Sequence, residues 1–273
     1  MTAQRETVLI TGATSGIGRD FADLFAERGY DLFLASRNGE KMKAITAHLE
    51  ARRGVKVTTL AVDLARSDAA AKVYETARAR HIEISVLVNN AGAGIAGELA
   101  DMDIGKIQEM IQLNVTTLTE LCRLFGGDMK KRRKGYILNV ASTAAYQPTP
   151  FTAVYGATKS YVLSFSEALA QEMKDYGVSV TCLSPGPTDT NFFAGVGVEG
   201  LAEKARGIWA ISRRMPSCKV AEIGLDALFA GKLSVIAGGL NALVAFANRL
   251  APRKTSARLS GKVMKQASTR GSV

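Results

Sequence analysis

Short runs of apolar and β-branched residues alternate along the chain with longer segments whose apolar residues recur every three or four positions. The short runs predict strands over residues 7–11, 31–36, 56–62, 86–89, 136–141, 179–184 and 234–237. The longer segments predict helices over residues 18–28, 41–52, 69–80, 104–129 and 155–176. Strands that alternate with helices form parallel sheets covered by helices on both faces. We therefore expect an α/β fold with a doubly wound, seven-stranded parallel sheet.

The longest predicted helix, over residues 104–129, carries a regular apolar stripe. Its members, at spacings of three and four, are Ile104, Ile107, Ile111, Val115 and Leu118. Positions with this spacing lie on one face of an α-helix. The sequence therefore predicts that this stripe faces the core.

Length and composition fit one domain. The chain has 273 residues, 47% of them hydrophobic, and no repeat or linker divides it, so we expect a single domain over residues 1–273. The three cysteines are too scattered for a disulfide framework, which favours a reducing, cytoplasmic location. The N-terminus shows no signal pattern, and the longest apolar stretch, residues 233–247, is too short and too interrupted to span a bilayer.

Positive charge is concentrated in two places. The net charge is +10, and residues 130–134 contribute five bases in a row, which we interpret as a solvated helix end. Residues 249–273 contain seven bases and no acid. This second segment is either a solvated helix or a contact for an anionic partner or membrane surface. Neither segment interleaves aromatic residues with its bases, so a nucleic-acid partner is not expected.

A glycine-rich loop follows the first predicted strand and opens the first helix. It reads Thr11-Gly12-Ala13-Thr14-Ser15-Gly16-Ile17-Gly18. Glycine lets the backbone turn sharply and approach a pyrophosphate, and the helix that follows offers free N–H groups to it. Because no Gly-Lys-Ser/Thr ends the loop, it predicts a dinucleotide site rather than a P-loop.

The end of the second predicted strand indicates which dinucleotide is bound. Sites for NAD usually place an acid there, whereas this chain has Ser36-Arg37. A carboxylate would repel a 2′-phosphate, while Arg37 can bind it with charge-assisted hydrogen bonds. Asp31 begins the strand and so lies too far away. The sequence therefore predicts NADP(H), although a solvated surface role for Arg37 stays open.

Three side chains suggest acid–base chemistry. Tyr155 and Lys159 are four residues apart and share a helix face. An ammonium near a phenol stabilises the phenolate and lowers the pKa of the tyrosine towards neutrality. Ser142 follows the fifth predicted strand, at the carboxyl edge where such sheets bind ligands. We expect Ser142 to hydrogen-bond a substrate oxygen while Tyr155 gives or takes the proton.

In these features the chain resembles the short-chain dehydrogenase/reductase family, in its compact branch. The resemblance covers residues 5 to about 240, with a basic amphipathic extension over residues 241–273. Besides the glycine loop, the motifs that carry it are Asp63-Leu64, Asn89-Asn90-Ala91-Gly92, Asn114, Ser142, Tyr155-Gly156-Ala157-Thr158-Lys159 and Pro185-Gly186-Pro187-Thr188-Asp189-Thr190. It implies a Rossmann fold and a hydride transfer between NADP(H) and a carbonyl or alcohol carbon, with no metal.

The resemblance also implies roles for individual residues. Tyr155 would be the general acid/base, Lys159 would tune it and bind the nicotinamide ribose, Ser142 would orient the carbonyl, and Asn114 would hold a water that links Lys159 to solvent. The residues expected to contact the cofactor are Gly12, Thr14, Ser15, Gly16, Ile17, Gly18, Ser36, Arg37, Asp63, Leu64, Asn90, Ala91, Gly92, Tyr155, Lys159, Pro185, Gly186, Thr188 and Thr190. Homodimers or tetramers through residues 104–129 and 155–176 are expected by resemblance alone.

Substrate choice is expected to depend on residues 191–219, where glycines stand beside large apolar side chains. This stretch is either a mobile lid over an apolar pocket or a surface helix. Ala93, Ile95 and Phe151 could add to the apolar wall of the substrate pocket. Together with residues 191–219 they predict a hydrophobic ketone, aldehyde or ketoacyl substrate. Two other function classes stay open, a regulator that binds NADP without turnover and a basic membrane-surface adaptor.

The C-terminal extension carries an apolar stripe that ends at Pro252. The stripe consists of Leu240, Leu243, Val244, Ala247 and Leu250. We expect it to pack across a subunit interface or over the substrate cleft. A basic helix lying on an anionic membrane is the alternative, and we do not favour it at this stage.

Overall fold

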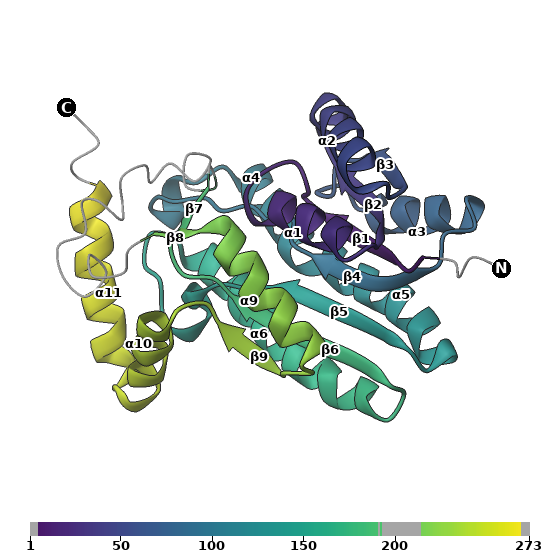
Figure 1. The fold of residues 1–273 in the computed structure, drawn as a ribbon. Helices are drawn as coiled ribbons and strands as arrows, with labels where there is room; N and C mark the ends of the chain where they lie inside the picture. Colours follow the sequence, from purple (N-terminus) through teal and green to yellow (C-terminus); the bar gives the residue numbers. More distant parts are fainter. Residues whose placement is uncertain (1–4, 191, 193–213, 269–273) are drawn as a thin grey trace.

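The computed structural model describes residues 5–190, 192 and 214–268, and side-chain burial up to residue 262. One parallel sheet of seven strands runs through the molecule in the order β3-β2-β1-β4-β5-β6-β9 (Figure 1). Its strands are β1 (Thr7–Thr11), β2 (Asp31–Ser36), β3 (Val57–Ala61), β4 (Ile84–Asn89), β5 (Gly135–Val140), β6 (Val178–Ser184) and β9 (Ser234–Ile236). The order reverses between β1 and β4, so the sheet is doubly wound, as predicted.

Helices cover both faces of the sheet. One layer consists of α1 (Gly16–Glu27), α2 (Gly39–Arg53) and α9 (Ser217–Phe229). The other layer consists of α3 (Ala69–Ala79), α5 (Leu118–Arg132) and α6 (Ala153–Lys174). Successive strand residues point to opposite faces, so each strand feeds both layers. In β1, Val8 and Ile10 pack against the first layer and Leu9 against the second.

A π-helical turn corrects the predicted helix over residues 104–129. The segment is α4 (Ile104–Ile111), a π turn (Gln112–Thr117) and then α5. The wider turn changes the helical register, because each of its hydrogen bonds encloses one residue more than in an α-helix. The predicted stripe is wrong at Ile104 and Ile111, which are 67% and 39% exposed. Ile107 and Leu118 of the stripe are buried, as predicted. Further buried residues of the segment include Met110, Asn114, Thr117, Leu121 and Cys122.

The basic run at residues 130–134 ends α5, as predicted. Three of its residues form ion pairs with acids of other elements or of the same helix: Lys131 with Asp128, Arg132 with Glu83, and Lys134 with Glu6. Lys130 lies 4.0 Å from the centre of the Tyr176 ring. These contacts hold the C-terminal end of α5 against the neighbouring elements.

After β6, the sequence patterns missed helix α9 and a small second sheet. A two-stranded parallel sheet pairs β7 (Thr188–Asp189) with β8 (Met215–Pro216). Beyond β9, helices α10 (Gly239–Leu250) and α11 (Arg253–Ser268) lie at the end of the molecule remote from the N-terminus (Figure 1). None of the described helices is both long and apolar enough to cross a bilayer.

Candidate active site

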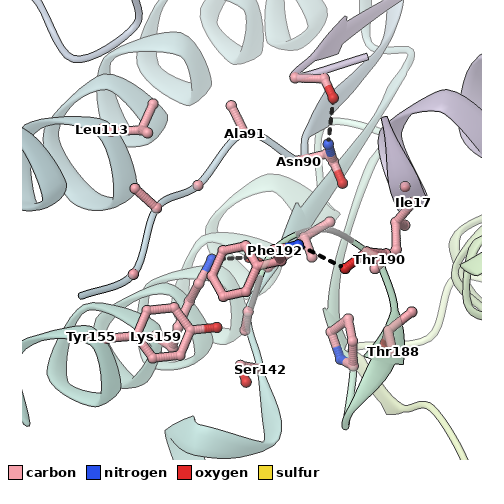
Figure 2. Close-up of a pocket in the computed structure, with 18 of the residues that line it drawn as sticks. Ile17, Asn90, Ala91, Leu113, Ser142, Tyr155, Lys159, Thr188, Thr190 and Phe192 are labelled. Atoms are coloured by element: carbon pink, nitrogen blue, oxygen red, sulfur yellow. Dashed lines mark hydrogen bonds between the residues drawn. The ribbon is translucent and has the colours of Figure 1, made fainter. Parts of the chain in front are cut away.

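A cavity of about 630 Å³ opens at the carboxyl edge of the sheet, beside the reversal in strand order. Doubly wound sheets bind ligands at this place, because the loops that follow neighbouring strands diverge there. Of the residues predicted from the sequence to be catalytic or to contact the cofactor, all line the cavity except Gly18 and Asn114. Figure 2 shows several of them around the opening.

The glycine loop fits an anionic ligand. Gly12 and Gly16 have φ angles of 68° and 53°, which favour glycine. A Cβ on Gly16 would lie 2.7 Å from Thr190 Cγ2, so a side chain at this position would clash with Thr190. Ser15 precedes α1 without capping it through its side chain, and the first turn of the helix holds no acid. The N-terminus of α1 therefore offers N–H groups to the cavity.

Gly18 supports the loop from behind. A Cβ at this position would lie 2.3 Å from Asn90 Nδ2 and 2.4 Å from the Gly12 carbonyl oxygen. Asn90 in turn donates from Nδ2 to the carbonyl oxygens of Thr11 (3.0 Å) and Gly12 (3.2 Å). The Thr11 hydroxyl accepts from the backbone N–H groups of Asn90 and Ala91, both at 3.0 Å. These contacts fix the loops after β1 and β4 to each other.

Arg37 stands at the end of β2 and lines the cavity with an exposed side chain. It forms no ion pair with any of the described residues, so its guanidinium is available to a ligand. Ser36 beside it hydrogen-bonds Thr14 of the glycine loop at 3.2 Å. Asp31 lies at the opposite end of β2, as predicted, where it accepts from the Lys56 backbone.

Asp63 and Leu64 form the cavity wall beyond β3. Asp63 accepts from the backbone N–H of Ala65 at 3.1 Å, which orders the turn. The Leu64 carbonyl accepts from the Thr117 hydroxyl at 2.8 Å. The turn is therefore held to the π turn that precedes α5.

Tyr155 lies in the first turn of α6, and its hydroxyl lies on the side of the ring towards Ser142 (Figure 2). Ser142 itself accepts from the Ala144 backbone N–H at 3.1 Å, which sets its position after β5. Burial raises the pKa of Tyr155 to about 12, and the hydrogen bond from Ser142 opposes this rise. The direction of this shift favours the protonated phenol at neutral pH.

Lys159 is buried on the same helix face. Its Nζ donates to the Val140 carbonyl oxygen at 2.9 Å, and burial lowers its pKa to about 8. Nζ lies 5.9 Å from the centre of the Tyr155 ring. In this geometry burial has the largest effect on the pKa of Tyr155, and Lys159 donates to a backbone carbonyl. That Lys159 lowers the pKa of Tyr155 stays a prediction.

Gly92 makes room between Lys159 and Asn114. A Cβ at position 92 would lie 3.2 Å from Lys159 Nζ and 3.3 Å from Asn114 Oδ1. Asn114 lies behind the cavity wall, where it exchanges hydrogen bonds with the backbone of Ala93 (2.9 and 2.8 Å) and donates to Thr158 at 3.0 Å. It sits inside the π turn, a feature frequently found at functional sites.

The turn after β6 closes the other side of the cavity. Its members Pro185, Gly186, Thr188 and Thr190 all line the cavity, as predicted. Gly186 packs so closely on α10 that a Cβ would lie 2.3 Å from Asn241 Nδ2. Phe192 places its ring 5.6 Å from that of Tyr155, centre to centre (Figure 2).

The cavity also has walls that no motif identified. Gln147, Thr149 and Thr152 follow β5, Ser260 comes from α11, and Arg214 precedes β8. The Nε atom of Arg214 is buried without a hydrogen-bond partner among the described residues. Local sequence gives no signal for such residues, since only the fold brings them to the cavity.

The predicted substrate wall is confirmed only in part. Ala93 lines the cavity, whereas Ile95 and Phe151 are not among its lining residues, so those two predictions are wrong. Phe151 has a φ of 64°, and its carbonyl accepts from the Gly97 backbone. Most of the predicted substrate stretch, residue 191 and residues 193–213, lies outside the described residues.

Comparison with known proteins agrees with this geometry. A family profile described as short chain dehydrogenase matches residues 6–198, which is more than half of the chain. The solved structure of a short-chain dehydrogenase from Sphingobium yanoikuyae in complex with NADPH is 30% identical. It aligns with a TM-score of 0.78 over 90% of this chain and 94% of its own.

Two curated relatives have named substrates. The very-long-chain 3-oxoacyl-CoA reductase of Rattus norvegicus is 35% identical over 66% of this chain and 58% of its own length. The 17-beta-hydroxysteroid dehydrogenase type 3 of Mus musculus is 34% identical over 65% of this chain and 58% of its own length. The match thus spans less than two thirds of either relative.

Proposed function

The chain belongs to the short-chain dehydrogenase family, and from that premise we propose that it uses NADPH to reduce the carbonyl group of a hydrophobic ketone, aldehyde or ketoacyl compound. Its class is that of oxidoreductases acting on C=O and CH–OH groups. The proposal rests on the contact of Tyr155 with Ser142, with Lys159 nearby. All three line the same cavity as the glycine loop and Arg37.

The chain's residues fit NADP(H). The glycine loop leaves backbone space for a pyrophosphate, and the free N-terminus of α1 stabilises its charge. Arg37, which no described acid neutralises, would bind the 2′-phosphate. Asp63 and Leu64 would contact the adenine, and Thr188 and Thr190 the nicotinamide end. The NADPH complex of the Sphingobium relative supports the same choice.

Bound NADPH would supply the hydride that reaches the carbonyl carbon. The carbonyl oxygen becomes negative as the hydride arrives, so hydrogen-bond donors held around it lower the barrier. Ser142 and Tyr155 are placed as those two donors, and Tyr155 then gives up its proton. Lys159, behind the phenol, returns a proton to it, and Asn114 would hold the water that resupplies Lys159.

The protonation states favour reduction. With its pKa raised to about 12, the Tyr155 phenol keeps its proton at neutral pH and can act as an acid. Lys159, with its pKa lowered to about 8, can exchange a proton with solvent near neutrality. Alcohol oxidation would instead need a phenolate as base. We therefore expect the site to favour the reductive direction.

An apolar substrate is supported by the cavity walls and by the relatives. Ala93, Leu113 and Phe192 supply apolar surface near the Tyr155 ring. The names of the two curated relatives give a very-long-chain 3-oxoacyl-CoA as the substrate of one and a hydroxysteroid as the substrate of the other. Both carry a carbonyl or alcohol on a large hydrophobic skeleton.

We also propose a cytoplasmic homo-oligomer. Cys122 and Cys182 are buried free thiols, which fits a reducing compartment. Exposed apolar side chains on the helices expected to form the interface, Ile104, Ile111 and Tyr161, support self-association.

Fluorescence titration with NADPH and with NADH, followed by a panel of carbonyl compounds monitored through NADPH absorbance, tests the function. We expect tighter binding of NADPH and turnover of large apolar ketones or 3-oxoacyl thioesters. Binding without any turnover would support a cofactor-sensing regulator instead. Turnover of small polar sugars alone would contradict the substrate class, and no NADPH binding at all would remove the enzyme assignment.

A further inference from the structure

Helix α10 has its apolar side facing solvent. Leu243, Phe246 and Leu250 are 62%, 59% and 75% exposed, and Leu240 on the same side is 40% exposed. Large apolar side chains that stand together in water are unfavourable and mark a surface that binds something. The predicted stripe is therefore present, and in the single chain it is exposed and does not cover the substrate cleft.

The polar side chains of α10 face the protein instead. Asn248 donates to Gln147 Oε1 (2.6 Å) and to the Val244 carbonyl (3.1 Å). Asn241 donates to the Ala237 carbonyl at 2.7 Å and packs against Gly186. Because both asparagines point inward, rotating the helix to bury the leucines would break these contacts. The orientation is thus fixed by the fold.

Helix α11 has two different faces. Ser256 and Ser260 are each only 6% exposed, and Ser260 lines the active-site cavity. Lys254, Arg258 and Lys262 recur at intervals of four residues and are exposed, so they form one basic stripe on the outer face. The inner face forms part of the cavity wall, which agrees with the expectation that the extension packs over the substrate cleft. The outer face is open to a partner.

The charge of this region has a single sign. No Asp or Glu follows Asp226 in the chain. None of the bases of α10 and α11 forms an ion pair within the part of the chain that the structure describes. Both helices lie at the same end of the molecule (Figure 1). Exposed apolar side chains and unpaired bases therefore occur at the same end of the molecule.

We propose that α10 and α11 form a peripheral docking surface for anionic lipid bilayers. Leu240, Leu243, Phe246 and Leu250 enter the boundary between headgroups and acyl chains, and the stripe of Lys254, Arg258 and Lys262 binds the headgroups. Helices that lie in a membrane interface combine apolar residues on one side with Lys and Arg near the headgroups in this way.

A bilayer fits this surface better than a second copy of the chain does. Two copies joined symmetrically through these helices would bring their unpaired bases together with no acid between them, and like charges repel. Anionic headgroups supply the missing negative charge, and acyl chains supply the apolar environment.

Co-sedimentation of the full-length protein with vesicles tests the proposal. One vesicle type contains phosphatidylcholine alone and the other an equimolar mixture of phosphatidylcholine and phosphatidylglycerol. We expect binding to the mixed vesicles, weakened by salt, and little to the neutral ones. Lys254→Gln/Arg258→Gln/Lys262→Gln should lower partitioning on the order of 100-fold. Leu243→Ser/Phe246→Ser should lower it at least about tenfold.

Matched controls separate this surface from general charge and hydrophobicity. Lys41→Gln/Lys43→Gln/Arg52→Gln removes the same charge from exposed positions of α2, and Leu99→Ser/Leu233→Ser removes exposed leucines elsewhere. Both controls should bind vesicles as the wild type does, and all four variants should keep carbonyl reduction in solution.

Three results would overturn the proposal. The first is a wild type that does not sediment with the mixed vesicles. The second is vesicle binding that either set of changes on α10 or α11 leaves unaltered. The third is a concentration-dependent dimer, without vesicle binding, that Leu243→Ser/Phe246→Ser abolishes, since the apolar face would then belong to a second copy.

Discussion

Arg37 is the residue on which we expect cofactor preference to depend. It ends β2 at the cavity with no carboxylate against it. We predict that Arg37→Ala weakens NADPH binding by about 10- to 100-fold, because a charge-assisted hydrogen bond contributes about 1.5–3 kcal/mol. Binding of NADH should change little. Fluorescence titration with both dinucleotides measures the difference.

Arg52→Ala is the matched control for that change, since Arg52 is exposed near the far end of α2. It should leave both affinities unaltered. Equal loss of NADPH and NADH affinity in Arg37→Ala would contradict a role in binding the 2′-phosphate.

Lys159 gives the reaction a pH dependence. Its pKa is lowered to about 8, whereas the pKa of Tyr155 is raised to about 12, so the ammonium loses its proton first as the pH rises. We predict that kcat/KM for reduction falls above pH 8 by up to about tenfold per pH unit, because the proton supply to the phenol is lost. A pH profile of kcat/KM reports this free-enzyme ionisation.

Unfolding cannot account for such a fall. A buried lysine with a lowered pKa prefers its neutral form, so the free energy of unfolding that it contributes rises between the folded pKa of about 8 and the ordinary value of 10.5. Circular dichroism over the same pH range should stay constant. A kcat/KM that stays level until alkaline unfolding would show that Lys159 is outside the proton path.

At the scale of single elements, the sequence predicted the strands well and the interrupted helix poorly. All seven strands of the main sheet were predicted within two residues, because apolar β-branched runs between turns carry a strong signal. The π turn around Asn114 has no such signal, since it depends on hydrogen bonds to Ala93 and Thr158 from distant elements. The predicted stripe failed at Ile104 and Ile111 for this reason.

Periodicity identified the apolar side of α10, which is exposed in the single chain, without identifying its surroundings. Apolar spacing identifies a face but does not say what covers it. Asn241 and Asn248, which hold the helix to the protein, looked like interruptions of the stripe. The motif residues of the cavity were predictable because each type has a local chemical reason, whereas Ser260 and Arg214 reach the cavity only through the fold.

Helix α11 is expected to limit substrate size. Ser260 is nearly buried and lines the cavity. We predict that Ser260→Leu raises the KM for bulky carbonyl compounds about tenfold or more, because an added side chain in a packed wall costs about 1–3 kcal/mol. Small ketones should be reduced with little change. Steady-state kinetics with a series of ketones of increasing size measures the effect.

Leu259→Ala provides the control, because Leu259 is the neighbouring residue and is 57% exposed. Its KM values should match those of the wild type. If Ser260→Leu left the size series unchanged, α11 would have no part in substrate selection.

The whole molecule presents a second exposed apolar surface, on α4 and α6. Ile104 and Ile111 of α4 and Tyr161 of α6 are all exposed, and α4 and α6 are in contact. We predict a homodimer or tetramer joined there, which Ile104→Asp/Tyr161→Asp converts to monomers, since unpaired carboxylates buried in such an interface are costly. Sedimentation velocity measures the state. Loss of assembly in Leu243→Ser/Phe246→Ser instead would assign the interface to α10.

Over the whole molecule, the fold brings together the glycine loop after β1, Arg37 after β2 and Tyr155 in the first turn of α6. We propose that they bind the pyrophosphate, bind the 2′-phosphate and donate the proton. These parts lie far apart in the sequence at Gly12, Arg37 and Tyr155 and line one cavity. Reduction depends on the last of them, since the phenol must deliver its proton as the carbonyl oxygen becomes negative.

The most direct test compares wild type with Tyr155→Phe for NADPH binding and for reduction of the best ketone from the carbonyl panel. The phenylalanine keeps the ring and its contact with Phe192 and removes only the hydroxyl. We predict unchanged NADPH affinity and a kcat lower by about 10²–10⁴. Turnover by Tyr155→Phe close to the wild-type rate would show that the proton comes from another group and would contradict the mechanism.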